Sequence, residues 1–228
     1  MRSKTGVLLV NLGTPDSPSV SDVRSYLSQF LNDPRVIDIP WLARKILVNL
    51  IIVPFRAPKS AAIYKKLWTA NGSPLLYFSN KVRDLLQQEL KEEYDVFLAM
   101  RYKNPSIASV LESMRKKNYS KIIVLPMFPQ YASASTGSAL DEVMRVLRTW
   151  WVIPEMKFIS QYYDQPTFID ALVARGKQYE LGAYDHVLFS YHGLPERQVD
   201  KVYSEGLCSD HNCESEITEE NKFCYKAT

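Results

Sequence analysis

Gly6–Asp22, with the sequence GVLLVNLGTPDSPSVSD, is the stretch that decides the fold of this chain. Its first part is an apolar run rich in leucine and valine, which predicts a buried strand over Gly6–Asn11. The run breaks at Gly13-Thr14-Pro15, and Ser19 then stands where a helix N-cap is expected. The stretch therefore predicts a strand, a loop and a helix in succession.

The same order recurs along the chain. Further strands are expected over Val96–Met100, Lys121–Pro126, Met156–Ser160 and His186–Ser190. Helices are expected over Pro105–Lys117, Ser138–Thr149, Gln165–Leu181 and Glu196–Glu205. Because continuous apolar strands alternate with helices, the pattern predicts an α/β fold with a doubly wound parallel sheet covered on both faces.

Composition favours an ordered globular protein. The 228 residues are 46% hydrophobic and 23% charged, with a formal net charge of +3. No dense basic run with interleaved aromatic residues marks a nucleic-acid surface, so we expect no nucleic-acid partner. Met1–Lys4 leads directly into the first strand without a cleavage site, which favours a cytoplasmic protein. Three cysteines in a reducing compartment argue against a disulfide framework.

One apolar segment interrupts the strand and helix rhythm. Pro40–Phe55 is strongly apolar, carries two adjacent charges at Arg44 and Lys45, and is too short to span a bilayer. It can form a core helix. Alternatively, it forms an exposed apolar lip that guards an apolar ligand pocket or makes a peripheral contact with the inner membrane.

A histidine follows the last expected strand. Ser190–Pro195 reads SYHGLP, which places His192 at the carboxyl end of the strand, where open α/β sheets bind ligands. Gly193 is expected to let the chain turn beside the imidazole, and Pro195 suits the first turn of the next helix. From the residues alone, an ordinary strand-end histidine and a functional one both remain open.

Five ordered motifs carry a resemblance to a known family. They are Asn11–Pro15, Gly72–Pro74, Met100–Tyr102, Pro129–Gly137 and Ser190–Pro195. Their order and approximate spacing resemble those of bacterial ferrochelatases. The resemblance implies two Rossmann-like domains facing a cleft, where ferrous iron is inserted into a porphyrin to make haem. We expect an N-terminal domain over residues 1–155, with its lip at 40–55, and the start of a second domain over 156–228.

The resemblance also implies roles for individual residues on the porphyrin. Leu12 matches a position that presents an apolar side chain to the macrocycle, and leucine in place of tyrosine there favours protoporphyrin over coproporphyrin. Arg56, Tyr64 and Ser73 match positions that hold the propionates, and arginine suits a planar carboxylate because of its paired donors. Without the family match, the same three residues would be a helix-cap charge, a half-buried aromatic and a turn serine.

Four further positions follow from the other motifs. Arg101 and Tyr102 resemble a pair near the metal side of the cleft. The loop from Gln130 to Gly137, which includes Tyr131, is interpreted as cleft wall, with a phosphate site at a helix N-terminus as the alternative.

His192 matches the family's proton acceptor and iron contact, because a neutral imidazole can do either near neutral pH. The family pairs this histidine with a later glutamate, for which this chain offers no convincing match. We therefore expect the chain to be the N-terminal portion of a longer protein, with an incomplete second domain and cleft. A non-catalytic tetrapyrrole carrier and a cobalt chelatase remain the alternative functions.

All three cysteines, Cys208, Cys213 and Cys224, lie in the polar segment 207–228. Some bacterial ferrochelatases carry an iron–sulfur cluster, and clustered thiols outside an apolar core fit one. A two-iron, two-sulfur cluster normally takes four thiolates, so a fourth ligand would have to come from outside this chain. Zinc bound with the help of His211, and free thiols, are the alternatives.

Overall fold

The computed structural model describes residues 4–211, 213 and 216–228. The chain forms two compact units. The first contains the residues up to Met127 together with Ser133–Ile159, and the second contains Phe128–Ala132 and Ser160–Thr228. Each unit is described separately below.

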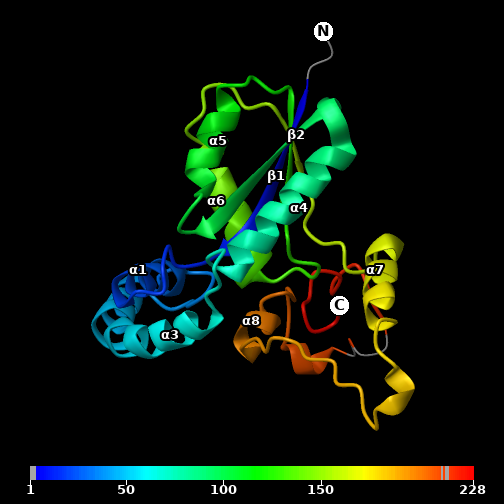
Figure 1. Cartoon of the computed structure of the whole chain (residues 1–228). Coiled ribbons are helices and arrows are strands. Elements are labelled where there is room, and N and C mark those ends of the chain that lie inside the picture. Colours follow the sequence, from blue (N-terminus) through cyan, green and yellow to red (C-terminus); the bar gives the residue numbers. More distant parts are fainter. Residues whose placement is uncertain (1–3, 212, 214–215) are drawn as a thin grey trace. The chain divides into compact units, whose positions relative to one another are not determined.

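Four parallel strands form the sheet of the first unit (Figure 1). They are β1 (Thr5–Gly13), β2 (Tyr94–Tyr102), β3 (Lys121–Pro126) and β4 (Glu155–Phe158), in the order β2-β1-β3-β4. Val7 of β1 pairs with Val96 on one side and with Ile123 on the other, so β1 is a central strand. A strand flanked by neighbours and covered on both faces must be apolar throughout, which confirms the interpretation of the opening stretch. β4 pairs with β3 and spans the domain boundary expected at residue 155.

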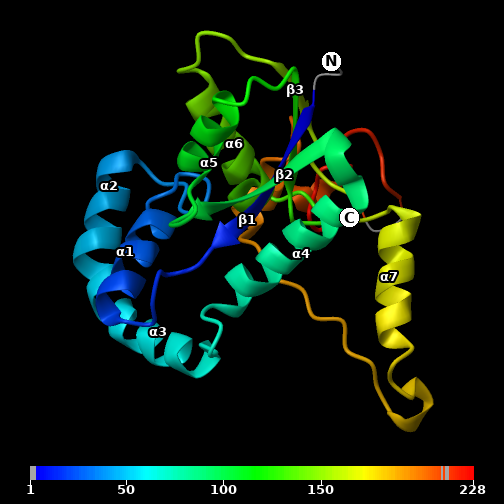
Figure 2. The same ribbon diagram turned by 45° about the horizontal axis from the view of Figure 1, so that its top comes forward.

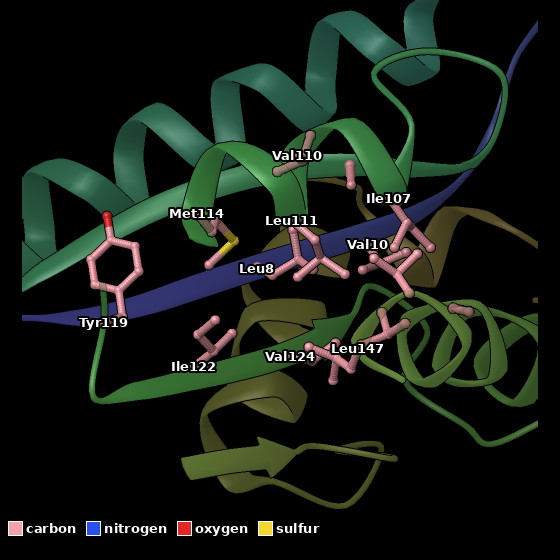
Figure 3. Close-up of a cluster of buried hydrophobic side chains, with 14 residues drawn as sticks. Leu8, Val10, Ile107, Val110, Leu111, Met114, Tyr119, Ile122, Val124 and Leu147 are labelled. Atoms are coloured by element: carbon pink, nitrogen blue, oxygen red, sulfur yellow. The ribbon is translucent and has the colours of Figure 1, made fainter. Parts of the chain in front are cut away.

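Helices cover both faces of this sheet. α5 (Ile107–Arg115) and α6 (Ser138–Leu147) lie on one face, and α4 (Pro74–Leu90) lies on the other (Figures 1 and 2). Figure 3 shows the core between the sheet and α5, with the side chains of Leu8, Leu111 and Val124 among those that meet there. The predicted doubly wound α/β arrangement is therefore confirmed for the first unit.

α1 (Val20–Leu31) begins where the sequence predicted. The hydroxyl oxygen of Ser19 accepts a hydrogen bond from the backbone N–H of Asp22 at 3.2 Å, which satisfies one of the free N–H groups at the helix start. The helix buries Val23, Tyr26, Leu27 and Leu31, which recur at helical spacing.

The expected apolar lip is part of a longer helix than the sequence suggested. α2 (Trp41–Ile46) continues through the π-helical stretch Leu47–Ile52 into α3 (Val53–Leu67). The backbone N–H of Val53 bonds to the carbonyl of Val48, five residues back, so the hydrogen-bond register has already shifted before Pro54. Pro54 stands in the first turn of α3, where proline is tolerated. Pro40 is the N-cap residue before Trp41, whereas Pro54 does not end the helix, and the helical run extends over residues 41–67.

The second unit contains α7 (Pro166–Gly176) and α8 (Glu196–Asp200). The strand expected over His186–Ser190 is wrong, because this segment has no regular structure and Leu188 is 90% exposed. A parallel strand needs neighbours for its backbone groups, and no strand occurs among the described residues of this unit. The absence of a second sheet here agrees with the prediction that the second domain is incomplete.

Short turns of 3-10 helix complete the described structure, at Lys91–Glu93, Leu181–Ala183 and Cys208–Asp210. A second π-helical stretch, Ser133–Gly137, leads directly into α6. It belongs to the loop that the sequence predicted as cleft wall.

Candidate functional site

The candidate site is built on the carboxyl ends of β1 and β2. Gly13, the last residue of β1, pairs with Tyr102, the last residue of β2. Its φ is +114°, and a Cβ added there would lie 2.0 Å from the carbonyl oxygen of Tyr102. Only glycine allows the two backbones to approach so closely. The strand order β2-β1-β3-β4 reverses between β1 and β3, so the carboxyl end of β1 also borders the usual ligand position in such sheets.

Leu12 is held in place by its neighbours on β1. The side-chain oxygen of Asn11 accepts from the backbone N–H of Leu12 at 2.8 Å. The side-chain amide nitrogen of Asn11 donates to the hydroxyl of Ser79 on α4 at 3.0 Å. Leu12 is half-buried and packs against the aromatic cluster that contains Tyr64 and Tyr102. Three of the predicted porphyrin residues therefore come together in the structure.

Edge-to-face ring contacts organise this cluster. The ring of Tyr26 lies 6.2 Å from that of Tyr64 and 6.4 Å from that of Tyr102, and Phe30 approaches Tyr102 at 5.2 Å. Burial is the main cause that raises the pKa of the Tyr26, Tyr64 and Tyr102 hydroxyls. All three phenols are therefore protonated at neutral pH and can act as hydrogen-bond donors.

A buried carboxylate connects this cluster to α6. Asp33 Oδ2 accepts hydrogen bonds from Arg101 Nη2 at 2.6 Å, from the Tyr102 hydroxyl at 2.8 Å and from the Ser138 hydroxyl at 2.5 Å. Its Oδ1 accepts from the backbone N–H of Arg35 at 2.8 Å. Burial alone would raise the pKa of Asp33, but the bonds from Ser138 and Arg35 and the charge of Arg101 outweigh it and hold that pKa below its usual value.

The sequence indicated Arg101 and Tyr102 but not the two residues that hold them. In the structure Asp33 neutralises the guanidinium of Arg101, and Tyr102 is fully buried. The sequence did not indicate Asp33 and Ser138, because an aspartate after a helix and a serine at a helix start are common in proteins.

The remaining predicted anchors of the first unit lie apart from this network. Arg56 is exposed on α3, and its charge opposes the burial effect on the pKa of Tyr64, which lies later on the same helix. Ser73 is buried at the N-cap of α4, with no side-chain capping bond.

An open recess of about 550 Å³ lies beside the Asp33 network. It is lined by Ser25, Ser28, Gln29, Asn32, Asp33, Pro34, Lys45 and Arg101. The recess is polar, so it does not resemble the apolar pocket that a macrocycle requires.

The second unit holds His192, Gln130 and Tyr131. His192 is exposed in the segment without regular structure that precedes α8. Gly193 does not adopt a positive φ, so the expected sharp turn beside the imidazole is wrong. Because no strand directly precedes Gly193, no strand-to-helix turn is required at this position. The ring of Tyr131 contacts Phe223 edge-to-face at 5.6 Å, and Gln130 is half-buried.

The three cysteines gather in one buried cluster with Val199 and Tyr203. Burial raises the pKa of the Cys208 thiol, with smaller effects in the same direction from Cys213 and Cys224, which shows that the sulfurs are neighbours. Among the described residues, no group of three or more His, Cys, Asp or Glu side chains has the arrangement of a metal site.

His211 is engaged by residues other than the cysteines. Its ring stacks on Tyr203 at 3.8 Å, and Nε2 lies 3.1 Å from the carbonyl oxygen of Glu205. Nδ1 faces the carboxylate of Glu220 at 3.8 Å. The arrangement gives no support to His211 as a zinc ligand.

Comparison with known proteins identifies the family. A family profile described as ferrochelatase matches residues 4–221. This chain belongs to the ferrochelatase family. A ferrochelatase of Legionella pneumophila (strain Paris) is 45% identical over 224 residues, which cover 98% of this chain and 66% of the relative. A ferrochelatase of Coxiella burnetii (strain CbuK_Q154) is 44% identical over 228 residues, covering 99% of this chain and 63% of the relative. The chain thus spans slightly less than two thirds of the length of these ferrochelatases.

Proposed function

We propose that the protein containing this chain inserts ferrous iron into a dicarboxylate porphyrin, with protoporphyrin IX favoured, to form haem. Membership of the ferrochelatase family over residues 4–221 carries the proposal. Both named relatives bear the name of that activity, and each shares at least 44% of its aligned residues with this chain.

Leu12, Arg101 and Tyr102, at the ends of β1 and β2, form the floor of the proposed site. This floor suits a flat apolar ligand. A porphyrin needs apolar walls with a few polar anchors for its propionates. Leu12 is half-buried at the end of a rigid central strand and backed by aromatic rings, so it can support one face of the macrocycle. Leucine there, in place of tyrosine, supports protoporphyrin IX as the substrate.

One cation and two hydroxyl groups of the first unit are assigned to the propionates. Arg56 is exposed on α3, and Tyr64 on the same helix has a protonated hydroxyl that can donate to a carboxylate. Ser73 is the third proposed anchor. Arg101 is already paired with Asp33, so we assign Arg101 and Tyr102 to the floor itself rather than to a propionate.

Metal insertion requires that two pyrrole N–H protons leave the ring as Fe²⁺ enters it. We assign His192 to this step, because a neutral imidazole can accept a proton from the porphyrin or contact the incoming ion. Gln130 and Tyr131 are assigned to the wall of the porphyrin site.

The test measures metal insertion by the natural protein that contains this chain. Zinc insertion into protoporphyrin is followed by fluorescence and ferrous insertion by absorbance, for the wild type, His192→Ala and the matched control His186→Ala, which alters an exposed histidine of the same segment. We expect loss of turnover only in His192→Ala. Porphyrin binding without turnover in the wild type would indicate a carrier, and turnover only with cobalt and a corrin precursor would indicate a cobalt chelatase.

We also propose that the cysteine cluster contributes ligands to a two-iron, two-sulfur cluster. Three neighbouring buried thiols provide the right donor type, although three sulfurs leave one ligand to be supplied from outside the described residues. When bound, such a group would cross-link the segment that holds Cys208, Cys213 and Cys224.

The test of the cluster is spectroscopic. Anaerobically purified natural protein should show cluster absorbance and, after reduction, an electron paramagnetic resonance signal, and both should be lost in Cys213→Ser but kept in the control Ser209→Ala. Stoichiometric zinc without cluster signals, or three freely titratable thiols without metal, would overturn the proposal.

Finally, we propose that the outer face of the 41–67 helix makes a peripheral membrane contact in a cytoplasmic protein. Among the described residues this is the one helix long and apolar enough to cross a membrane, and only 22% of its most apolar window is buried. Its exposed apolar side chains include Leu42, Leu50 and Phe55. Binding of the natural protein to anionic lipid vesicles should fall in a Leu50→Ser/Phe55→Ser variant. It should persist in the control Val82→Ser/Leu85→Ser, which alters exposed apolar residues of α4.

A further inference from the structure

Asp33 stands where three elements of the first unit meet. It follows the C-cap of α1, and its carboxylate bonds to residues at the end of β2 and at the start of α6. Its side chain is only 2% exposed. A carboxylate this deeply buried is stable only when its oxygens are fully hydrogen-bonded.

The bonds to Asp33 fix the orientation of two side chains at once. Arg101 donates to Asp33 through Nη2 and to the hydroxyl and carbonyl oxygens of Ser138 through Nε, at 2.7 and 3.0 Å. The guanidinium carbon then lies 4.7 Å from the centre of the Tyr102 ring, and the Tyr102 hydroxyl points at the same carboxylate oxygen. Neither side chain can rotate without breaking a charge-assisted bond.

This arrangement bears on Leu12 as well. Tyr102 pairs with Gly13, the residue after Leu12, and belongs to the aromatic cluster against which Leu12 packs. A change in the Tyr102 ring would therefore change the support beneath Leu12.

We propose that Asp33 is a positioning residue for the porphyrin site: by holding Arg101 and Tyr102 in one orientation, it sets the floor against which the macrocycle lies. The inference rests on the proposed function. Asp33 itself touches no substrate, because its oxygens are used within the protein.

The test compares porphyrin binding and turnover in the natural protein with those of Asp33→Asn, a variant of nearly the same size. Glu112→Gln is the matched control, because Glu112 also forms a two-point pair with an arginine, but on the surface of α5. We expect the dissociation constant and KM for porphyrin to rise about tenfold in folded Asp33→Asn, while KM for iron stays unchanged. Glu112→Gln should behave as the wild type. Near-ultraviolet circular dichroism and a melting curve establish that each variant is folded at the assay temperature.

A double variant covers the case in which Asp33→Asn does not fold. Asp33→Asn/Arg101→Gln removes the unpaired buried cation and should fold, yet it should still bind porphyrin weakly because the Tyr102 ring has lost its restraint. Wild-type porphyrin affinity in either folded variant would overturn the role of Asp33. Failure of the wild type itself to bind porphyrin would instead overturn the proposed function.

Discussion

Gly13→Ala is expected to be the most damaging glycine substitution in the first unit. The new Cβ would lie 2.0 Å from the Tyr102 carbonyl oxygen, about 1 Å inside the 3.0 Å that real Cβ contacts respect. The obstacle is the backbone of the neighbouring strand β2, so it cannot rotate away. A strained φ costs about 1–3 kcal/mol and overpacking a further 1–3 kcal/mol, which predicts a loss of about 2–6 kcal/mol in the free energy of unfolding.

Two other glycines separate these causes. Gly72 also has a positive φ, +84°, but nothing lies within 4 Å of its Cβ position, so Gly72→Ala should cost only about 1–2 kcal/mol. Gly6 has an ordinary φ, but its Cβ position lies 2.7 Å from the fully buried end of Met114 and 3.0 Å from the ring of Tyr119. Gly6→Ala should therefore cost about 1–3 kcal/mol through overpacking alone.

Urea unfolding of the 228-residue chain, followed by tryptophan fluorescence, measures all three variants. The four tryptophans, at positions 41, 68, 150 and 151, belong to the first unit, so the signal reports on the unit that contains the substitutions. Equal losses for Gly13→Ala and Gly72→Ala would refute the claim that contact between β1 and β2, rather than φ alone, requires glycine at Gly13.

Four further outcomes are expected. The pKa of Asp33 is lowered in the folded chain, so the wild type should be more stable than Asp33→Asn by about 3–5 kcal/mol, the cost of breaking a buried pair. This difference should be full above about pH 5 and shrink as the pH falls through the pKa of the folded chain. Urea titrations at several pH values measure it, and a difference that grows in acid would contradict the prediction. Leu111→Ala should cost about 2–5 kcal/mol in the same assay because the side chain is fully buried, and a loss below 1 kcal/mol would show that the core collapses around the gap. Ser19→Ala should cost about 1 kcal/mol through its lost cap, whereas a neutral result would mean that water replaces the hydroxyl. Cys208 is buried and the pKa of its thiol is raised, so it should react with iodoacetamide much more slowly in the folded chain than in urea. Peptide mass spectrometry measures both rates, and equal rates would contradict its burial.

The fold of the first unit could be predicted because each strand is recognisable from its own residues. A central parallel strand is apolar at every position, and the β1 run shows that property without reference to any distant residue. The Ser19 cap is likewise a signal within four residues. By contrast, His186–Ser190 carries the same apolar signal yet forms no strand, since a strand also requires neighbours that the sequence pattern of one segment cannot supply.

The candidate site was predictable only in part for a related reason. The family resemblance pointed to Leu12, Tyr64, Arg101 and Tyr102, and the structure brings these residues to one region of the first unit. The role of Asp33 depends on bonds to residues 68 and 105 positions away in the chain, and no local pattern encodes such a pairing. Long-range polar networks are therefore the feature that sequence reading misses most readily.

The floor of the proposed porphyrin site and the outer face of the 41–67 helix differ in how much buried structure supports them. The floor consists of strand ends and a buried ion pair, so a substitution at Gly13 or Asp33 changes stability and ligand geometry together. The outer face of the 41–67 helix is already exposed, with Phe55 at 75%, so truncating it removes little buried area from the folded chain. Substitutions on that face should therefore alter porphyrin or membrane binding at nearly constant stability. It follows that loss of function on the helix face can be attributed to binding directly, whereas loss of function at the floor must first be corrected for the fraction of folded protein.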